Sequence, residues 1–180
     1  MAERRGLIMG VANDHSIAWG IAEALHNAGA DLAFTYQSEA IARRVTPLAE
    51  SVGSDIILPC DVTDPGSLDS VFTTLEAKWS KFDFVLHAIA YSDKEELKGK
   101  YVDTSRDNFR TTMDISCYSF TAIAQRAAPL LNKGGGLLTL TYSGSKRVMP
   151  NYNVMGVAKA ALEASVRYLA VDLGLSLIHI

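Results

Sequence analysis

The chain has 180 residues, of which 48% are hydrophobic and 21% are charged, a balance typical of a globular protein that buries one sizeable core. Its formal net charge of −3 and its scattered basic residues predict no nucleic-acid partner. The first apolar run, before Gly10, is too short for a signal peptide or a membrane span, so we expect a soluble, cytoplasmic protein with no membrane partner.

The two cysteines, Cys60 and Cys117, lie far apart in apolar segments. No Cys-x-x-Cys pair or Cys/His cluster accompanies them, so we expect buried thiols in a reducing compartment and no metal site.

Short apolar runs alternate with helical patterns along the chain. Strands are expected at Gly6–Gly10, Asp31–Tyr36, Asp55–Pro59, Phe82–Ala88 and, after a glycine turn at residues 134–136, Leu137–Leu140. Helices are expected from Ser16 to Ala28, Glu39 to Ser51, Leu68 to Trp79 and, as one long apolar helix, Arg106 to Leu131. The breadth of the last helix suggests burial against another subunit as well as the sheet.

This alternation predicts an α/β fold, a Rossmann-type doubly wound parallel sheet with strand order 3-2-1-4-5. We expect one domain over residues 1–174 and a ligand beyond the carboxyl ends of the strands.

Two phenols and one amine fall in a pattern with chemical meaning after the fifth expected strand. Tyr142 follows this strand, Tyr152 begins a helical pattern, and Lys159 comes seven residues later, or about two helical turns. A phenol beside a fixed ammonium can donate a hydrogen bond to a developing oxyanion. Tyr and Lys at this spacing also occur on ordinary helix faces, so the pattern alone does not establish a catalytic site.

The turn after the first expected strand, Gly10 to Gly20, is longer than a standard G-x-G-x-x-G loop. Its glycines would let the backbone approach a pyrophosphate, and Ser16 is placed to cap the following helix and to bind a phosphate. The alternative is an ordinary glycine turn with a helix cap.

The second and third expected strands end in polar residues suited to the adenine side of a dinucleotide. Gln37 replaces the acid that commonly binds the ribose, and the lack of a basic residue before Arg43 favours NADH over NADPH. Asp61 could accept from the adenine amino group, or could simply form a turn.

Five motifs occur in order: G-x5-S-I-A-x-G at Gly10–Gly20, T-Y-Q at Thr35–Gln37, C-D-V at Cys60–Val62, H-A-I at His87–Ile89, and Y-x9-Y-x6-K ending at Lys159. Together they resemble the bacterial NADH-dependent enoyl-[acyl-carrier-protein] reductases, a divergent branch of the short-chain dehydrogenase/reductases. The main branch of that superfamily uses Y-x3-K, and here Gly156 stands four residues after Tyr152.

The resemblance implies an oxidoreductase of fatty acid biosynthesis. It would transfer a hydride from NADH to C3 of a trans-2-enoyl thioester linked to acyl carrier protein, and it would form a homotetramer. Tyr142, Tyr152 and Lys159 would be catalytic, with Tyr152 stabilising the enolate oxygen and Lys159 holding the nicotinamide ribose; Ser92 would approach the substrate. The cofactor-binding residues implied are Gly10, Ser16, Ile17, Gln37, Asp61, Val62, Ile89 and Lys159.

Two departures from the family pattern stand out. Ala90 replaces a usual glycine, which adds one methyl group near the cofactor. The resemblance ends at Gly174: residues 175–180 do not match, and we expect a non-native tail, with the last strands of the sheet and the substrate-covering segment missing. On that basis we expect residues 1–180 alone to be weakly stable and inactive.

Two other functions remain open from the sequence. A 3-oxoacyl-thioester reductase would need the missing Y-x3-K motif. A non-catalytic NAD(H)-binding module would share the fold but would not need Tyr152 and Lys159 near the nicotinamide.

Overall fold

Five parallel strands form the centre of the molecule. The computed structural model describes residues 3–174, and in this range the strand order is β3-β2-β1-β4-β5, which confirms the predicted topology. The strands are β1 (Arg5–Met9), β2 (Asp31–Tyr36), β3 (Ile57–Pro59), β4 (Phe82–His87) and β5 (Leu131–Thr139). Leu7 of β1 lies opposite Ala33 of β2 and Val85 of β4, so β1 is at the middle of the sheet.

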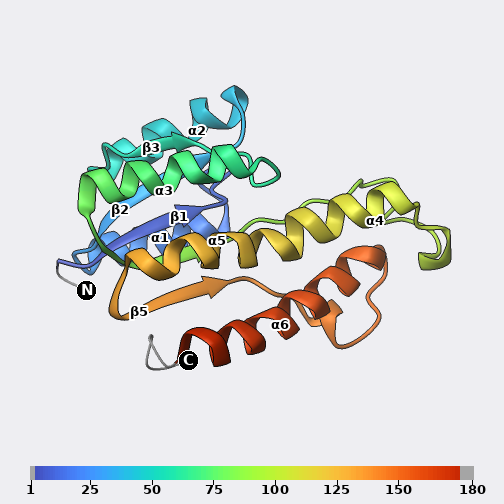
Figure 1. The fold of residues 1–180 in the computed structure, drawn as a ribbon. Coiled ribbons are helices and arrows are strands. Elements are labelled where there is room, and N and C mark those ends of the chain that lie inside the picture. Colours follow the sequence, from blue (N-terminus) through green and yellow to red (C-terminus); the bar gives the residue numbers. More distant parts are fainter. Residues whose placement is uncertain (1–2, 175–180) are drawn as a thin grey trace.

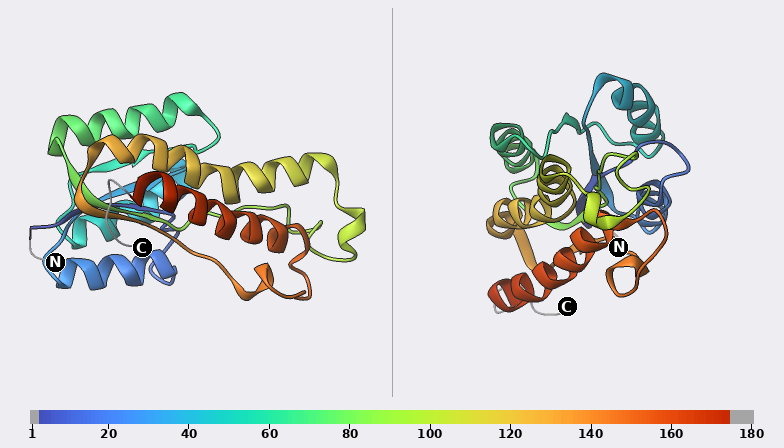
Figure 2. Two further views of the ribbon diagram at one scale, coloured as in Figure 1. Left: turned by 60° about the horizontal axis from the view of Figure 1, so that its bottom comes forward. Right: turned by 90° about the vertical axis from the view of Figure 1, so that its right-hand side faces the viewer.

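Helices cover both faces of this sheet (Figures 1 and 2). They are α1 (Ile17–Asn27), α2 (Glu39–Ser51), α3 (Pro65–Trp79), α4 (Arg106–Met113), α5 (Ser119–Ala127) and α6 (Asn153–Gly174). Because side chains alternate along a strand, Ile8 packs with α1 and α2, whereas Leu7 and Met9 pack with α3 and α5. The continuous apolar runs of the sequence therefore reflect strands buried on both faces.

The last helix extends the fold beyond the sheet. Leu162 of α6 is fully buried against Cys117 and Phe120, so α6 lies along the α4–α5 segment, beside Leu137 of β5. In Figure 1, α4 and the first turns of α6 project past the carboxyl ends of the strands. Lys159 lies on α6 and Tyr152 immediately before it, whereas Ser92 lies in the loop after β4.

Two expected boundaries were wrong. The glycines at 134–136 belong to β5 rather than to a turn before it: Gly134 has φ +78°, and the β4–β5 register shifts between Phe82 and Phe84. A Cβ at Gly135 would lie 2.8 Å from the backbone oxygen of Asp83, which explains why this irregular pairing needs glycine. The third strand begins at Ile57, two residues later than expected.

The long helix expected at Arg106–Leu131 is also interrupted. A π-helical turn, Asp114–Tyr118, separates α4 from α5, and a 3-10 turn closes the segment at Ala128–Leu130. At the π turn, the Ser116 hydroxyl accepts from the backbone N–H of Tyr91 at 2.9 Å and donates to its carbonyl at 3.0 Å. This contact with the loop after β4 fixes the position of the distortion.

No helix among residues 3–174 combines the length and the hydropathy needed to cross a membrane. Residues 175–180, the expected non-native tail, lie outside the part of the chain that the structure describes.

Asp83 joins β1, β4 and β5 near the amino ends of these strands. Its carboxylate accepts from Arg4 Nη1 at 2.6 Å, from the backbone N–H of Arg5 at 2.8 Å and from Asn132 Nδ2 at 3.1 Å. Burial opposes ionisation, but these hydrogen bonds and the charge of Arg4 together hold the pKa of Asp83 below its ordinary value.

We expect Asp83→Asn to lower the free energy of unfolding at neutral pH by about 1–3 kcal/mol, because charge-assisted bonds are replaced by weaker ones. A carboxylate with a depressed pKa stabilises the fold above its unfolded pKa, and this contribution is lost as the pH falls through the folded pKa. Urea unfolding from neutral to acid pH should therefore show that the free energy of unfolding falls less in Asp83→Asn than in the wild type. Asp55→Asn, in an exposed pair with Lys78, is the control and should have little effect; equal effects of the two variants would contradict the prediction.

Candidate active site

The candidate site begins where β1 and β4 end. Gly10 follows β1 with φ +102°, and a Cβ there would overlap the carbonyl oxygen of Ala88. No other residue satisfies both the backbone angle and the space. The loop after β1 can therefore lie directly against the end of β4 and leave its backbone open to a ligand.

A cavity of about 490 Å³ opens at this point, along the carboxyl ends of the strands. Five of the predicted cofactor residues line it together: Gly10, Gln37, Asp61, Val62 and Ile89. Thr35, Tyr36 and Cys60 also line it, at the ends of β2 and β3. The motifs at the ends of successive strands thus meet at one edge of the sheet.

Asp61 has a structural role at the rim of this cavity. Its Oδ1 accepts from the backbone N–H of Thr63 at 2.9 Å and from the Thr63 hydroxyl at 2.7 Å. This is the turn-forming role left open by the sequence. A carboxylate has further lone pairs, so the turn does not prevent Asp61 from accepting a ligand N–H.

Ser16 and Ile17 lie at the start of α1, outside the residues that line the cavity. Ser16 occupies the N-cap position, but its hydroxyl donates to the backbone oxygen of Asn13 at 2.5 Å instead of accepting from a helix N–H, so the expected cap hydrogen bond is absent at this residue. Ile17 is 70% exposed.

Ser92 is turned inward. It is buried, its hydroxyl accepts from Thr112 Oγ1 at 2.9 Å, and Asn108 lies within hydrogen-bonding distance at 3.2 Å. Its side chain therefore serves a buried polar network between the loop after β4 and α4.

The three predicted catalytic side chains lie around the start of α6. Tyr152 comes immediately before the helix, between Asn151 and Asn153, both of which have positive φ (57° and 30°). Asn tolerates this conformation better than most residues, and the two turns direct the Tyr152 ring towards Tyr142. The rings meet edge to face, with centroids 5.0 Å apart.

The environment keeps the Tyr152 phenol neutral. Burial raises its pKa, and the neighbouring Tyr142 adds to this shift. A neutral phenol is a hydrogen-bond donor at physiological pH. Gly144 leaves room for this ring, since a Cβ there would overlap it.

Lys159 is only 7% exposed, and within residues 3–174 its Nζ makes one hydrogen bond, to the backbone oxygen of Leu140 at 2.8 Å. Burial lowers the pKa of this ammonium, with a smaller opposing effect from Cys117. An ammonium has three donors, so Lys159 has the capacity to bind a ligand as well as hold the end of β5.

His87, at the end of β4, was missed as part of the site. Burial lowers its pKa to about 3, assisted by the positive charge of Lys159, so the imidazole is neutral. The Ser119 hydroxyl donates to the backbone oxygen of Ile115 at 2.6 Å and must therefore accept from His87 Nε2 at 2.8 Å. Nδ1 then accepts from Thr139 Oγ1 at 2.9 Å, and the imidazole joins β4, β5 and α5.

Two further side chains were missed by the sequence analysis. Ile115 lines the nucleotide-side cavity because the π turn points it there, and no local pattern reveals a π turn. Glu163 holds the segment that carries Tyr142; its position four residues after Lys159 was the available clue.

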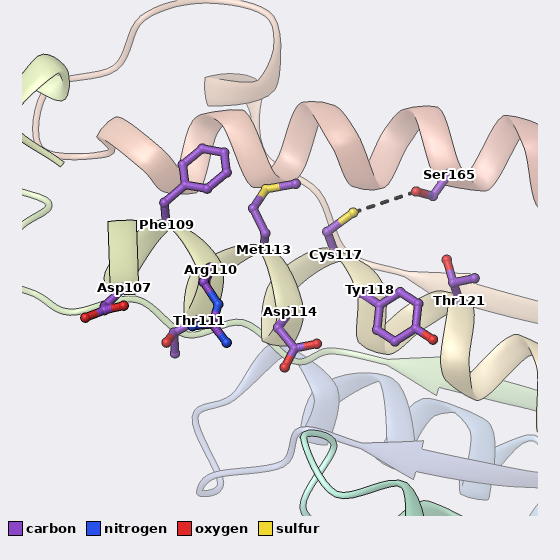
Figure 3. A pocket seen from close by; sticks show the side chains of 10 residues that line it. All are labelled: Asp107, Phe109, Arg110, Thr111, Met113, Asp114, Cys117, Tyr118, Thr121 and Ser165. Atoms are coloured by element: carbon purple, nitrogen blue, oxygen red, sulfur yellow. Dashed lines mark hydrogen bonds between the residues drawn. The ribbon is translucent and has the colours of Figure 1, made fainter. Parts of the chain in front are cut away.

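A separate groove of about 780 Å³ lies between α4–α5 and α6 (Figure 3). Phe109, Met113 and Tyr118 line it, and Cys117 contacts Ser165 Oγ at 3.7 Å across it. Most of the groove is formed by α4, the π turn and α5, the segment expected from the sequence to contact another subunit.

The strand order, with Gly10 opening the loop after β1 at the switch point, defines a Rossmann-type fold, a class that binds dinucleotides. The family model for enoyl-(acyl carrier protein) reductase matches residues 10–180. The chain belongs to this family.

Individual relatives agree with this assignment. The chain is 68% identical over 174 residues to enoyl-[acyl-carrier-protein] reductase [NADH] 2 of Rhizobium meliloti, covering 97% of this chain and 65% of the relative. It is 54% identical over 171 residues to the corresponding reductase of Rickettsia bellii, covering 95% and 65%. The chain thus spans about 65% of the length of these curated relatives.

Solved structures show the same fold. The reductase of Anaplasma phagocytophilum in complex with NAD superimposes with a TM-score of 0.95 at 59% identity, covering 98% of this chain and 68% of that one. The Bacillus cereus reductase with NADP⁺ and an indole naphthyridinone gives 0.96 at 49% identity, covering 98% and 69%.

We expect Gly10→Ala to lower the free energy of unfolding by about 2 kcal/mol or more, because the methyl group requires β1 and β4 to move apart. Gly20→Ala is the matched control: a Cβ at this position of α1 meets nothing within 4 Å, so it should leave stability unchanged or raise it by up to about 1 kcal/mol. Urea unfolding of both variants tests the close approach. An unchanged free energy of unfolding in Gly10→Ala would show that stability does not depend on the close contact between Gly10 and Ala88.

Proposed function

We propose that this protein is an NADH-dependent enoyl-[acyl-carrier-protein] reductase, acting in fatty acid biosynthesis on a trans-2-enoyl thioester linked to acyl carrier protein. The observation that carries this proposal is the neutral phenol of Tyr152, seven residues before the buried ammonium of Lys159, in a chain whose strand ends form a Rossmann-type cavity. The high identity to relatives named as NADH-dependent enoyl reductases supports the same activity.

The cavity suits a dinucleotide. Because Gly10 has no side chain, a pyrophosphate could approach the backbone there. Gln37, Asp61 and Val62 would hold the adenine side of the dinucleotide. Ile89 also lines the cavity and would contact the nicotinamide end of the dinucleotide. Lys159 would bind the hydroxyl groups of the nicotinamide ribose. Ser16 and Ile17 would complete the phosphate side at the N-terminus of α1. The absence of a basic residue near Gln37 favours NADH.

When bound, NADH supplies the hydride that reaches C3 of the enoyl thioester. Tyr152 would donate a hydrogen bond to the thioester carbonyl and stabilise the enolate oxygen that forms as the double bond is reduced. Its raised pKa keeps the proton on the phenol until this charge develops. Tyr142 would support this donor through the edge-to-face contact, and the segment around Ser92 would approach the acyl chain.

The two alternatives are less well supported. A 3-oxoacyl-thioester reductase would need a lysine at position 156, where Gly156 is packed so closely that a Cβ would lie 2.8 Å from the backbone oxygen of Gly144. A non-catalytic nucleotide-binding module would not require a buried lysine and a neutral phenol near the cofactor.

We further propose that the protein acts in the cytoplasm as a homo-oligomer, a tetramer by analogy with the family, in which a second copy covers the groove of Figure 3. Tyr118 of this groove is 59% exposed, and Tyr168 and Val171 of α6 are 76% and 74% exposed. Exposed aromatic and aliphatic side chains on two neighbouring helices are typical of a surface that becomes buried on assembly.

We expect Tyr152→Phe to lower kcat about 100-fold in the full-length protein, because it removes one oxyanion donor. Lys159→Ala should raise KM for NADH about 10- to 100-fold through loss of charged hydrogen bonds. Turnover of a trans-2-enoyl thioester, followed by loss of NADH absorbance, measures both variants. Asp55→Asn changes an exposed carboxylate paired with Lys78 and should match the wild type.

The same assay separates the competing functions. Full turnover in Tyr152→Phe would refute the assigned role. NADH binding without turnover of the enoyl thioester would favour the non-catalytic module, and turnover of a 3-oxoacyl thioester in its place would favour the other reductase.

We expect Tyr118→Lys to shift the protein towards a smaller species in size-exclusion chromatography with light scattering, because a charge would be buried in the interface. Val148→Lys, at a 98% exposed loop position, is the control and should leave the molar mass unchanged. A wild type that is monomeric at micromolar concentration would contradict the proposed assembly.

A further inference from the structure

The segment between β5 and α6 is held by two side chains on one face of α6. Lys159 donates to the backbone oxygen of Leu140, as described above. One turn later, Glu163 Oε1 accepts from Thr141 Oγ1 at 2.7 Å and from Ser145 Oγ at 2.5 Å. Two side chains spaced four residues apart therefore fix the start and the end of the same short segment.

Tyr142 lies between the two residues that Glu163 holds. Its backbone oxygen accepts from the N–H of Ser145 at 2.9 Å, which closes the 3-10 turn Ser143–Ser145. Its side chain extends from this turn to meet the edge of Tyr152. Gly144, in the same turn, packs against the Tyr152 ring. The position of the turn therefore determines how both phenols lie.

We propose that Glu163 is a positioning residue: its carboxylate holds the turn that carries Tyr142 and thereby sets the contact between Tyr142 and Tyr152. This inference rests on the proposed reductase function, in which Tyr152 is the oxyanion donor. Glu163 itself touches neither phenol and acts through Thr141 and Ser145.

The charge of Glu163 suits this role. The hydrogen bonds from Ser145 and Thr141 lower its pKa; slight burial opposes this, and the positive charges of Lys146 and Arg167 add to the lowering. The ammonium of Lys159 lies one turn earlier on the same helix. The carboxylate is therefore ionised at neutral pH and accepts both hydroxyl groups, and the turn is expected to loosen only in acid.

The test compares three variants by a readout that does not depend on activity. Nuclear Overhauser effects between the ring protons of Tyr142 and Tyr152 report the contact directly. The His87–Phe120 ring pair, with centroids 5.4 Å apart in the core, serves as the internal reference. Glu163→Ala removes the acceptor, Glu163→Gln keeps an oxygen that can accept both hydroxyl groups, and Asp172→Ala removes an exposed carboxylate from the same helix.

We expect Glu163→Ala to lose the Tyr142–Tyr152 effect and to keep the reference effect. Glu163→Gln should retain most of the contact, and Asp172→Ala should match the wild type. In turnover assays of the full-length protein, Glu163→Ala should lower kcat about 10-fold or more and leave KM for NADH within about twofold, because a misplaced phenol affects the reaction rather than cofactor binding. Glu163→Gln should restore most of kcat.

A Tyr142–Tyr152 effect of wild-type intensity in Glu163→Ala would overturn the proposal. If Glu163→Ala instead loses the reference effect too, the double variant Thr141→Val, Ser145→Ala decides, since it removes both hydroxyl donors and keeps Glu163. Loss of the ring contact alone in this variant supports the proposal, and its retention overturns it. A wild type without turnover would refute the reductase function, whereas the ring contacts would still decide the role of Glu163.

Discussion

The close approach between the ends of β1 and β4 is the constraint on which the rest of the site depends. Gly10 has no space for a Cβ because the carbonyl oxygen of Ala88 occupies it, and its φ of +102° is unfavourable for other residues. This contact brings the loop after β1 beside the segment after β4. The residues at the ends of β2 and β3 then complete one cavity along the same edge of the sheet. A fold with a wider gap here would separate the two parts of the cavity.

In the proposed catalytic half of the site, burial rather than close pairs of opposite charge shifts the pKa values. Desolvation raises the pKa of Tyr152 and lowers that of Lys159, so both shifts favour the neutral form over the charged form. His87 is neutral for the same reason. The neutral histidine adds no positive charge near Lys159, and its two hydrogen bonds hold β4, β5 and α5 together.

The sequence predicted the sheet order, and five of the eight expected cofactor residues lie along one cavity, because these features follow from local signals. Alternating apolar runs and helical patterns determine a parallel sheet, and the ends of parallel strands meet at one edge. The glycines at 134–136 were misassigned because glycine marks a turn or a bulge equally well, and only the pairing of β5 with Phe82 and Phe84 distinguishes the two. The π turn contacts the loop after β4 through Ser116 and Tyr91, and Thr112 of α4 holds Ser92 inward. Contacts between segments distant in the sequence produce no periodic pattern that a sequence reading could detect.

The spacing of Tyr152 and Lys159 shows how local backbone chemistry changes the meaning of a motif. Seven residues correspond to about two helical turns, but Tyr152 precedes α6, and the left-handed conformations at Asn151 and Asn153 direct its ring. The Asn153 side chain also lies 3.4 Å from the carbonyl oxygen of Glu96, so it connects the start of α6 to the loop after β4. A Tyr and a Lys four residues apart would lie on one face of a regular helix, whereas here the Tyr precedes the helix, between two asparagines with positive φ. Two backbone segments position the Tyr152 phenol: the residues beside it, Asn151 and Asn153, and the 3-10 turn Ser143–Ser145 that packs against its ring. Because Lys159 lies on α6, its position relative to the phenol depends on how the helix begins after Tyr152.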